Sequence, residues 1–154
     1  MTLHFAYGSN MSRPLMAVRC PQARALGLAT LSGWRFIINS DGLASLVPQK
    51  GGRVHGVLWQ LSTRDVAAIN AYEDLASGLY VSRLLPVQVG ERHANALVYL
   101  ARRRGKGIPR PAYIQLVIEA ALDWNLPQPY IRSITRWSPS RWRGIRAKET
   151  GELK

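Results

Sequence analysis

Two short segments carry residue types that could perform acid–base chemistry. The first is Glu73, which directly follows the apolar-periodic stretch 63–72. A carboxylate at the C-terminal end of a helix meets the negative end of the helix dipole, and burial adds to this effect, so both raise its pKa. A carboxyl group tuned in this way suits a general acid and base working near neutral pH. Taken alone, however, the segment is more typical of an exposed glutamate.

The second segment is Tyr7-Gly8-Ser9-Asn10, which follows a short apolar run at the N-terminus. A glycine at this point lets the backbone turn sharply and approach a ligand closely. The successive N–H groups of Gly8, Ser9 and Asn10 would then form a concavity that suits a carboxylate or a developing oxyanion. By itself this pattern also describes an ordinary turn.

The remaining reactive residue types do not form a recognisable site. The histidines His4, His55 and His93 have no metal-ligand spacing to one another or to Cys20, so we expect no metal site. His4 and His55 fall in predicted strands, which favours structural or surface roles. Cys20 has no neighbouring base and is a weak nucleophile candidate. Hydrolase-elbow, dinucleotide-binding and P-loop glycine patterns are absent, and no cofactor is expected.

The elements that must position these residues are mainly strands. Apolar and β-branched runs separated by turn residues predict strands at 3–7, 29–38, 43–47, 54–61, 79–89 and 94–100. The turn signals that separate them are Asn39-Ser-Asp-Gly, Gln49-Lys-Gly-Gly and Gly90. Pro86 indicates an edge or a bulge in the strand 79–89.

Helices are predicted at four places. The stretch 11–18 favours a helical turn, and Ser62 with Asp65 forms a capping box in front of a helix at 63–72. A third helix begins at Pro111 and ends before Asn125, and a last one covers 129–137. Strands followed by a helix, further strands and then helices indicate an α+β fold.

The length of 154 residues predicts one domain, 1–137, followed by a basic C-terminal tail at 138–154. The N-terminus lacks the features of a signal peptide, and a single cysteine excludes an intramolecular disulfide, so we expect a cytoplasmic protein. The net charge is +12, with one basic cluster at 102–106 and more basic residues in the tail. Such charge runs most often form a solvated surface.

Several segments together resemble the γ-glutamylcyclotransferase family, which includes the AIG2-like proteins. The resemblance spans about residues 4–137 and rests on Phe5-Ala-Tyr-Gly-Ser-Asn-Met11, Asn39-Ser40, Val54-His-Gly-Val-Leu-Trp59, Tyr72-Glu73, Ser77-Gly-Leu-Tyr80, Val98-Tyr-Leu100, Pro111-Ala-Tyr113 and Ala120 to Tyr130. It implies a small mixed β-barrel with flanking helices. It also implies an enzyme that converts a γ-glutamyl amino acid or amine to 5-oxoproline and the free amine, without metal or cofactor.

The resemblance assigns roles to particular residues. Glu73 becomes the general acid and base, and Tyr7, Gly8, Ser9, Asn10, Tyr80 and Tyr113 become substrate-binding residues. One departure is Asp74, where many family members have glycine. The identity of the leaving amine and the oligomeric state stay open.

A second reading is a catalytically silent member of the fold that binds nucleic acid or another anionic partner. It rests on the cluster 102–106 and on Trp137 and Trp142, which lie among arginines as in surfaces that stack bases. No membrane contact is expected.

Overall fold

The computed structural model of the chain describes residues 1–73 and 78–139. Its centre is a closed five-stranded barrel in the order β1-β3-β2-β4-β5. Neighbouring strands run antiparallel except β1 and β5, which are parallel, so the sheet is mixed. The strands are β1 (Thr2–Ala6), β2 (Arg24–Ile38), β3 (Ala44–Leu61), β4 (Tyr80–Val89) and β5 (Arg92–Ala101). The predicted small mixed β-barrel with flanking helices is confirmed.

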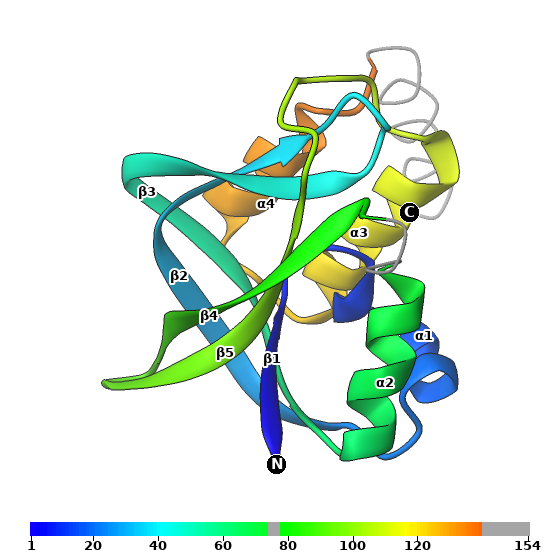
Figure 1. Ribbon diagram of the computed structural model, residues 1–154. Helices are drawn as coiled ribbons and strands as arrows, with labels where there is room; N and C mark the ends of the chain where they lie inside the picture. The colour runs from blue at the N-terminus through cyan, green and yellow to red at the C-terminus, as the bar shows by residue number, and fades with distance from the viewer. Residues whose placement is uncertain (74–77, 140–154) are drawn as a thin grey trace, which may run out of the picture.

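Four α-helices lie outside the barrel in the described part of the chain (Figure 1). They are α1 (Arg13–Arg19), α2 (Thr63–Tyr72), α3 (Pro111–Asp123) and α4 (Gln128–Thr135), and a 3₁₀ helix covers Ser9–Met11. The helices α1 and α2 contact each other on one flank of the barrel, and α3 packs on the 3₁₀ helix that follows β1. This arrangement brings the end of β1, the end of α2 and the start of α3 to one side of the molecule. None of the helices in the described ranges is long and apolar enough to cross a membrane.

The largest difference from the sequence prediction lies in β3. The segments 43–47 and 54–61 were predicted as two strands joined by a turn at Gln49–Gly52, and this prediction is wrong. Both belong to one strand that stays paired with β2, and the pairing shifts from Ser32–Arg53 to Trp34–Pro48. Gly51 has a φ of +76°, a conformation that glycine tolerates, so the extra residues form an irregularity in the strand. The chain bends here instead of reversing.

The core consists of the inward faces of the strands and one face of α3. Phe5, Leu31, Val57 and Val98 are each at most 1% exposed, as expected for a small barrel whose interior is filled by side chains. The helix α3 contacts both the 3₁₀ helix and α4, and its buried residues recur at helical spacing: Ile114, Val117, Ile118 and Ala121. The barrel is therefore a rigid support for the loops at its ends.

The ends of α2 and α3 follow from local sequence. At the start of α2 the Ser62 hydroxyl accepts a hydrogen bond from the Asp65 N–H (3.1 Å), which confirms the predicted capping box. The helix covers the predicted residues and Glu73 is its C-cap. Pro111 opens α3, and Asn125, with a φ of +54°, lies just beyond its end. The position of Glu73 thus follows from a helix whose start is defined by a capping box in the sequence.

Candidate active site

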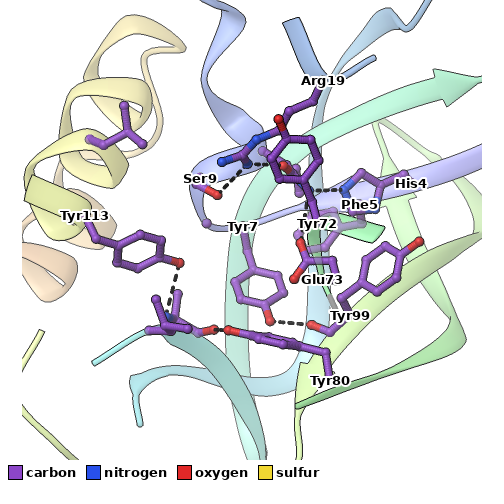
Figure 2. A pocket seen from close by; sticks show the side chains of 16 residues that line it. His4, Phe5, Tyr7, Ser9, Arg19, Tyr72, Glu73, Tyr80, Tyr99 and Tyr113 are labelled. Atoms are coloured by element: carbon purple, nitrogen blue, oxygen red, sulfur yellow. Dashed lines mark hydrogen bonds between the residues drawn. The ribbon is translucent and has the colours of Figure 1, made fainter. Parts of the chain in front are cut away.

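A cavity of about 230 Å³ opens beside the end of β1. Figure 2 shows the rings of Tyr7, Tyr80 and Tyr113 and the side chain of Glu73 around it. These residues come from the loop after β1, from β4, from α3 and from the end of α2. All of the residues assigned to a site from the sequence line this one cavity: Tyr7, Gly8, Ser9, Asn10, Glu73, Tyr80 and Tyr113. Their chemical roles remain predictions.

The loop after β1 turns directly into the 3₁₀ helix Ser9–Met11. Gly8 precedes this helix with a φ of −119°, so a left-handed backbone does not explain the glycine. Close packing does: a Cβ on Gly8 would lie 3.0 Å from the Tyr113 hydroxyl and 3.4 Å from the Ala44 side chain. The absence of a side chain lets the backbone of the loop approach the wall built by α3 and β3.

Glu73 points from the end of α2 toward this loop. Its N–H donates to the Ile69 carbonyl (2.8 Å), which anchors the backbone, and its Oε1 accepts a hydrogen bond from Asn10 Nδ2 (3.2 Å). Burial raises the pKa of Glu73 from 4.5 to about 7, while the positive charge of Arg19 and the hydrogen bond from Asn10 oppose this rise. A carboxyl group with this pKa can both accept and return a proton at neutral pH.

The three tyrosines do not present equivalent hydroxyl groups. Tyr7 donates to the Tyr99 carbonyl, and Tyr80 donates to the Ala44 carbonyl (3.2 Å). Tyr113 instead accepts a hydrogen bond from the Ala44 N–H (3.1 Å), so its own proton remains available to a ligand. Burial raises the pKa of Tyr113 to about 12, which keeps this proton in place at neutral pH. The hydroxyl protons of Tyr7 and Tyr80 are therefore used within the protein, whereas that of Tyr113 is not used in the bond to Ala44.

Comparison with known proteins places the chain in a family. Residues 4–124 match the model of the family described as γ-glutamyl cyclotransferase, AIG2-like. The chain belongs to the AIG2-like γ-glutamyl cyclotransferase family. The matched range contains the loop after β1, Glu73 and Tyr113, and so the whole of the candidate site.

Two relatives of this family member are the γ-glutamylcyclotransferases of Mus musculus and Homo sapiens. They are 24% and 23% identical to it, over 98% of this chain and 86% of each relative. Its fold is similar to that of a solved γ-glutamyl cyclotransferase, with a TM-score of 0.81 and 25% identity over 87% of this chain and 86% of that chain. It also resembles the crystal structure of YkqA from Bacillus subtilis, with a TM-score of 0.75 and 25% identity over 88% of this chain and 53% of that chain. The family member is thus distantly homologous to enzymes.

Among the polar residues that line the cavity of this family member, Arg19 and His4 were not predicted from the sequence as site residues. Arg19 Nη1 donates to Ser9 Oγ (2.9 Å) and to Asn10 Oδ1 (2.8 Å), and its guanidinium lies 4.5 Å from the Tyr72 ring. His4 is 2% exposed and contacts Asn10 (Nδ2 to Nε2, 3.3 Å). Neither position carries a sequence pattern that indicates a functional site, because Arg19 lies just outside the predicted helical turn and His4 falls in a predicted strand.

Other residues that the sequence singled out lie away from the cavity or outside the described ranges. Cys20 is buried, and burial raises its thiol pKa to about 11, which leaves it unreactive. His55 lines a different hollow. In residues 1–73 and 78–139 no group of three or more His, Cys, Asp or Glu side chains is placed to hold a metal ion. Asp74 and the tail residues from 140 onward are not among the described residues.

Proposed function

We propose that this protein cyclises a γ-glutamyl amino acid or amine to 5-oxoproline and releases the free amine. The observation that carries the proposal is the placement of Glu73. Its carboxyl group, with a pKa of about 7, lines a small cavity together with the loop 7–10 and accepts a hydrogen bond from Asn10 of that loop. Membership of the γ-glutamyl cyclotransferase family supports the same reaction.

The reaction needs one proton carrier and no protein nucleophile. The Glu73 carboxylate takes a proton from the substrate α-ammonium group, and the freed amine attacks the γ-carbonyl carbon of the same molecule. A carbon–nitrogen bond forms to give a five-membered ring and a tetrahedral oxyanion. The oxyanion collapses, and the bond to the leaving nitrogen breaks as Glu73 returns its proton to that nitrogen. The second proton of the ring nitrogen passes to the released amine, which leaves as its ammonium form, and the ring keeps one N–H. The carboxylate is regenerated, so the cycle closes without a cofactor.

The rest of the cavity binds and orients the substrate. The N–H groups of Gly8, Ser9 and Asn10 bind the substrate carboxylate or the tetrahedral oxyanion, and the available proton of Tyr113 adds a further donor. Tyr7 and Tyr80 hold the walls of the cavity through their bonds to backbone carbonyls. A volume of about 230 Å³ lies below the range of roughly 300–1,000 Å³ common for drug-sized ligands. It therefore suits an amino-acid-sized group.

Confinement of the substrate lowers the activation barrier by as much as proton transfer does. A γ-glutamyl chain must curl before its amine can reach its own carbonyl carbon. Holding two reacting groups in the right geometry can lower a barrier by about 7–11 kcal/mol. A small cavity, lined by tyrosine side chains that hydrogen bonds hold in place, favours the curled conformer over the extended one.

The direct test measures 5-oxoproline release from a panel of γ-glutamyl amino acids, glutathione and γ-glutamylamines. We expect turnover of at least one class by the wild type and loss of turnover in Glu73→Gln. Glu91→Gln is the matched control, because Glu91 is an exposed residue in the β4–β5 turn. Release of 5-oxoproline by Glu73→Gln at the wild-type rate would refute the assignment of Glu73.

The alternative of a silent nucleic-acid-binding module gains little from the described residues. Arg103 pairs with Asp41 (3.2 Å), and Trp137 packs partly buried against the core instead of standing free to stack a base. Trp142 and its neighbouring arginines lie outside the described ranges. A salt titration of binding to an arbitrary oligonucleotide tests this alternative, because electrostatic contacts to phosphates weaken steeply with salt.

A further inference from the structure

A chain of buried hydrogen bonds connects the barrel wall to the candidate acid. His4 on β1 contacts the Leu97 carbonyl on β5 through Nδ1 (3.0 Å) and contacts Asn10 Nδ2 through Nε2 (3.3 Å). Asn10 Nδ2 in turn donates to Glu73 Oε1 (3.2 Å) (Figure 2). His4 and Asn10 are 2% and 5% exposed, so bulk water has little access to the contact between them, whereas the bond from Asn10 to Glu73 is partly buried. The proposed mechanism uses Glu73 but assigns nothing to His4.

The partners of His4 determine its tautomer. A backbone carbonyl only accepts hydrogen bonds, so the Nδ1 that faces Leu97 must carry the proton. In a neutral ring Nε2 is then the unprotonated nitrogen, and it can only accept. Burial lowers the pKa of His4 to about 4, although the bond to Leu97 opposes this, so the ring is neutral throughout the neutral pH range.

The tautomer of His4 and the Arg19 guanidinium, which can only donate, together fix the direction of the Asn10 amide. An acceptor at Nε2 requires the NH₂ group of Asn10 on that side, and the amide oxygen then faces Arg19, whose Nη1 donates to it (2.8 Å). Both hydrogens of the NH₂ group are used, one toward His4 and one toward Glu73. If the amide were reversed, its oxygen would face the carboxylate of Glu73 and destabilise its charged form.

We propose that His4 is a positioning residue which, as the neutral Nδ1–H tautomer, holds the Asn10 amide with an N–H directed at Glu73 and thereby sets the proton affinity of that carboxyl group. Its effect on the charge of Glu73 follows from the geometry alone, whereas its effect on turnover rests on the proposed function. His4 itself touches neither the substrate nor the reacting atoms in this scheme.

Other groups that face Glu73 stay constant when His4 is changed. Arg19 at the end of α1 supplies the nearby positive charge. The tyrosines that interact with Glu73 come from the loop after β1, from β4, from β5 and from α3: Tyr7, Tyr80, Tyr99 and Tyr113. His4 meets only Tyr99 among them, by an edge contact at 5.4 Å between ring centroids. A change in the titration of Glu73 on substitution of His4 therefore reports on the Asn10 amide.

The experiment follows the side-chain carboxyl carbon of Glu73 by ¹³C NMR against pH, with the signal assigned by its loss in Glu73→Gln. We expect the midpoint in His4→Phe to rise by up to about one pH unit, a tenfold change in proton affinity, because the amide keeps the donor Arg19 but loses the acceptor that holds its NH₂ group. In His4→Gln a side-chain oxygen can replace Nε2, and the midpoint should return toward the wild-type value. The control His55→Phe changes a histidine of another barrel strand, β3, which does not line the cavity, and should leave the midpoint unchanged.

The same carboxyl group links this titration to turnover. We expect the acid limb of kcat/KM to move with the NMR midpoint in His4→Phe, while the rate on the alkaline plateau changes less. If no γ-glutamyl compound releases 5-oxoproline, the proposed function fails, and the NMR midpoint still decides the role of His4.

Two results would overturn the proposal. One is a Glu73 midpoint in His4→Phe equal to that of the wild type. The other needs no variant: ¹⁵N shifts of His4 in the wild type that report an Nε2–H tautomer or a protonated ring between pH 6 and 8. The second measurement keeps the proposal testable even if His4→Phe does not fold.

Discussion

Replacing Glu73 by glutamine should stabilise the fold, and by an amount that depends on pH. The carboxyl group of Glu73 has its pKa raised from 4.5 to about 7, chiefly by burial. Between these two values the folded protein holds a proton that the unfolded chain releases. Folding stability therefore falls as pH rises through this window, because the folded state binds more protons than the unfolded state.

The magnitude follows from the size of the pKa difference. A displacement from 4.5 to about 7 corresponds to at most about 3 kcal/mol of destabilisation above pH 7, and to almost none below pH 4. Glutamine cannot ionise, but its amide oxygen can still accept the hydrogen bond from Asn10 Nδ2. Glu73→Gln should therefore gain up to about 3 kcal/mol over the wild type at pH 8.5, and almost nothing at pH 4.

Urea denaturation of the wild type and Glu73→Gln at several pH values between 4 and 8.5 measures this difference. For a domain of this size, 3 kcal/mol also corresponds to a rise in Tm of about 6–12 °C, which calorimetry would detect. Glu91→Gln serves as the control, because an exposed carboxylate is hydrated in both states. A stability difference for Glu73→Gln that is the same at pH 4 and pH 8.5 would show that Glu73 is not sheltered, and the assignment of a tuned acid and base would be refuted.

Three further predictions follow from the same cavity. The kcat/KM for a γ-glutamyl substrate should rise with pH through an apparent pKa of about 7, since the carboxylate form of Glu73 must accept the proton; a flat pH profile between 5.5 and 8 would contradict this role. Gly8→Ala should lower kcat/KM by about tenfold or more, because the added Cβ would lie 3.0 Å from the Tyr113 hydroxyl and displace it, whereas Gly105→Ala, whose Cβ would meet no atom within 4 Å, should keep wild-type activity. Tyr113→Phe should lower the free energy of unfolding by about 1–3 kcal/mol in urea titrations, since the N–H of the buried Ala44 loses its acceptor; an unchanged midpoint would show that this bond contributes nothing.

The turn predicted at residues 49–52 failed because strand pairing in the folded chain was not considered. The turn predicted at Gln49–Gly52 rested on local residue preferences, but β2 continues alongside this segment and keeps β3 extended. Pairing with a neighbouring strand can override a local turn signal, since the ladder of hydrogen bonds stabilises the extended chain. The segment Asn39–Gly42 has a similar signal and does form the turn between β2 and β3, since β2 ends there.

The polar network around Glu73 could not be predicted from local residue patterns. His4 and Asn10 are close in sequence, but Arg19, Glu73 and Leu97 are brought to them by a helix, a second helix and a parallel strand pair. Side-chain hydrogen bonds of this kind have no period and no spacing rule. Only packing decides which nitrogen of His4 faces which partner.

Local sequence patterns are sufficient to predict the α+β class, the helix 63–72 with its capping box, the position of Glu73 at the end of that helix, and the family that the opening loop resembles. These features depend on short-range patterns of polarity, caps and turn residues, which act within a few residues along the chain. Three features depend on the folded chain: β3 is continuous, Arg19 and His4 reach the cavity, and burial brings the pKa of Glu73 near 7. The physical reason is that strand pairing, burial and the direction of a hydrogen bond depend on partners distant in sequence, and closure of the barrel brings those partners together.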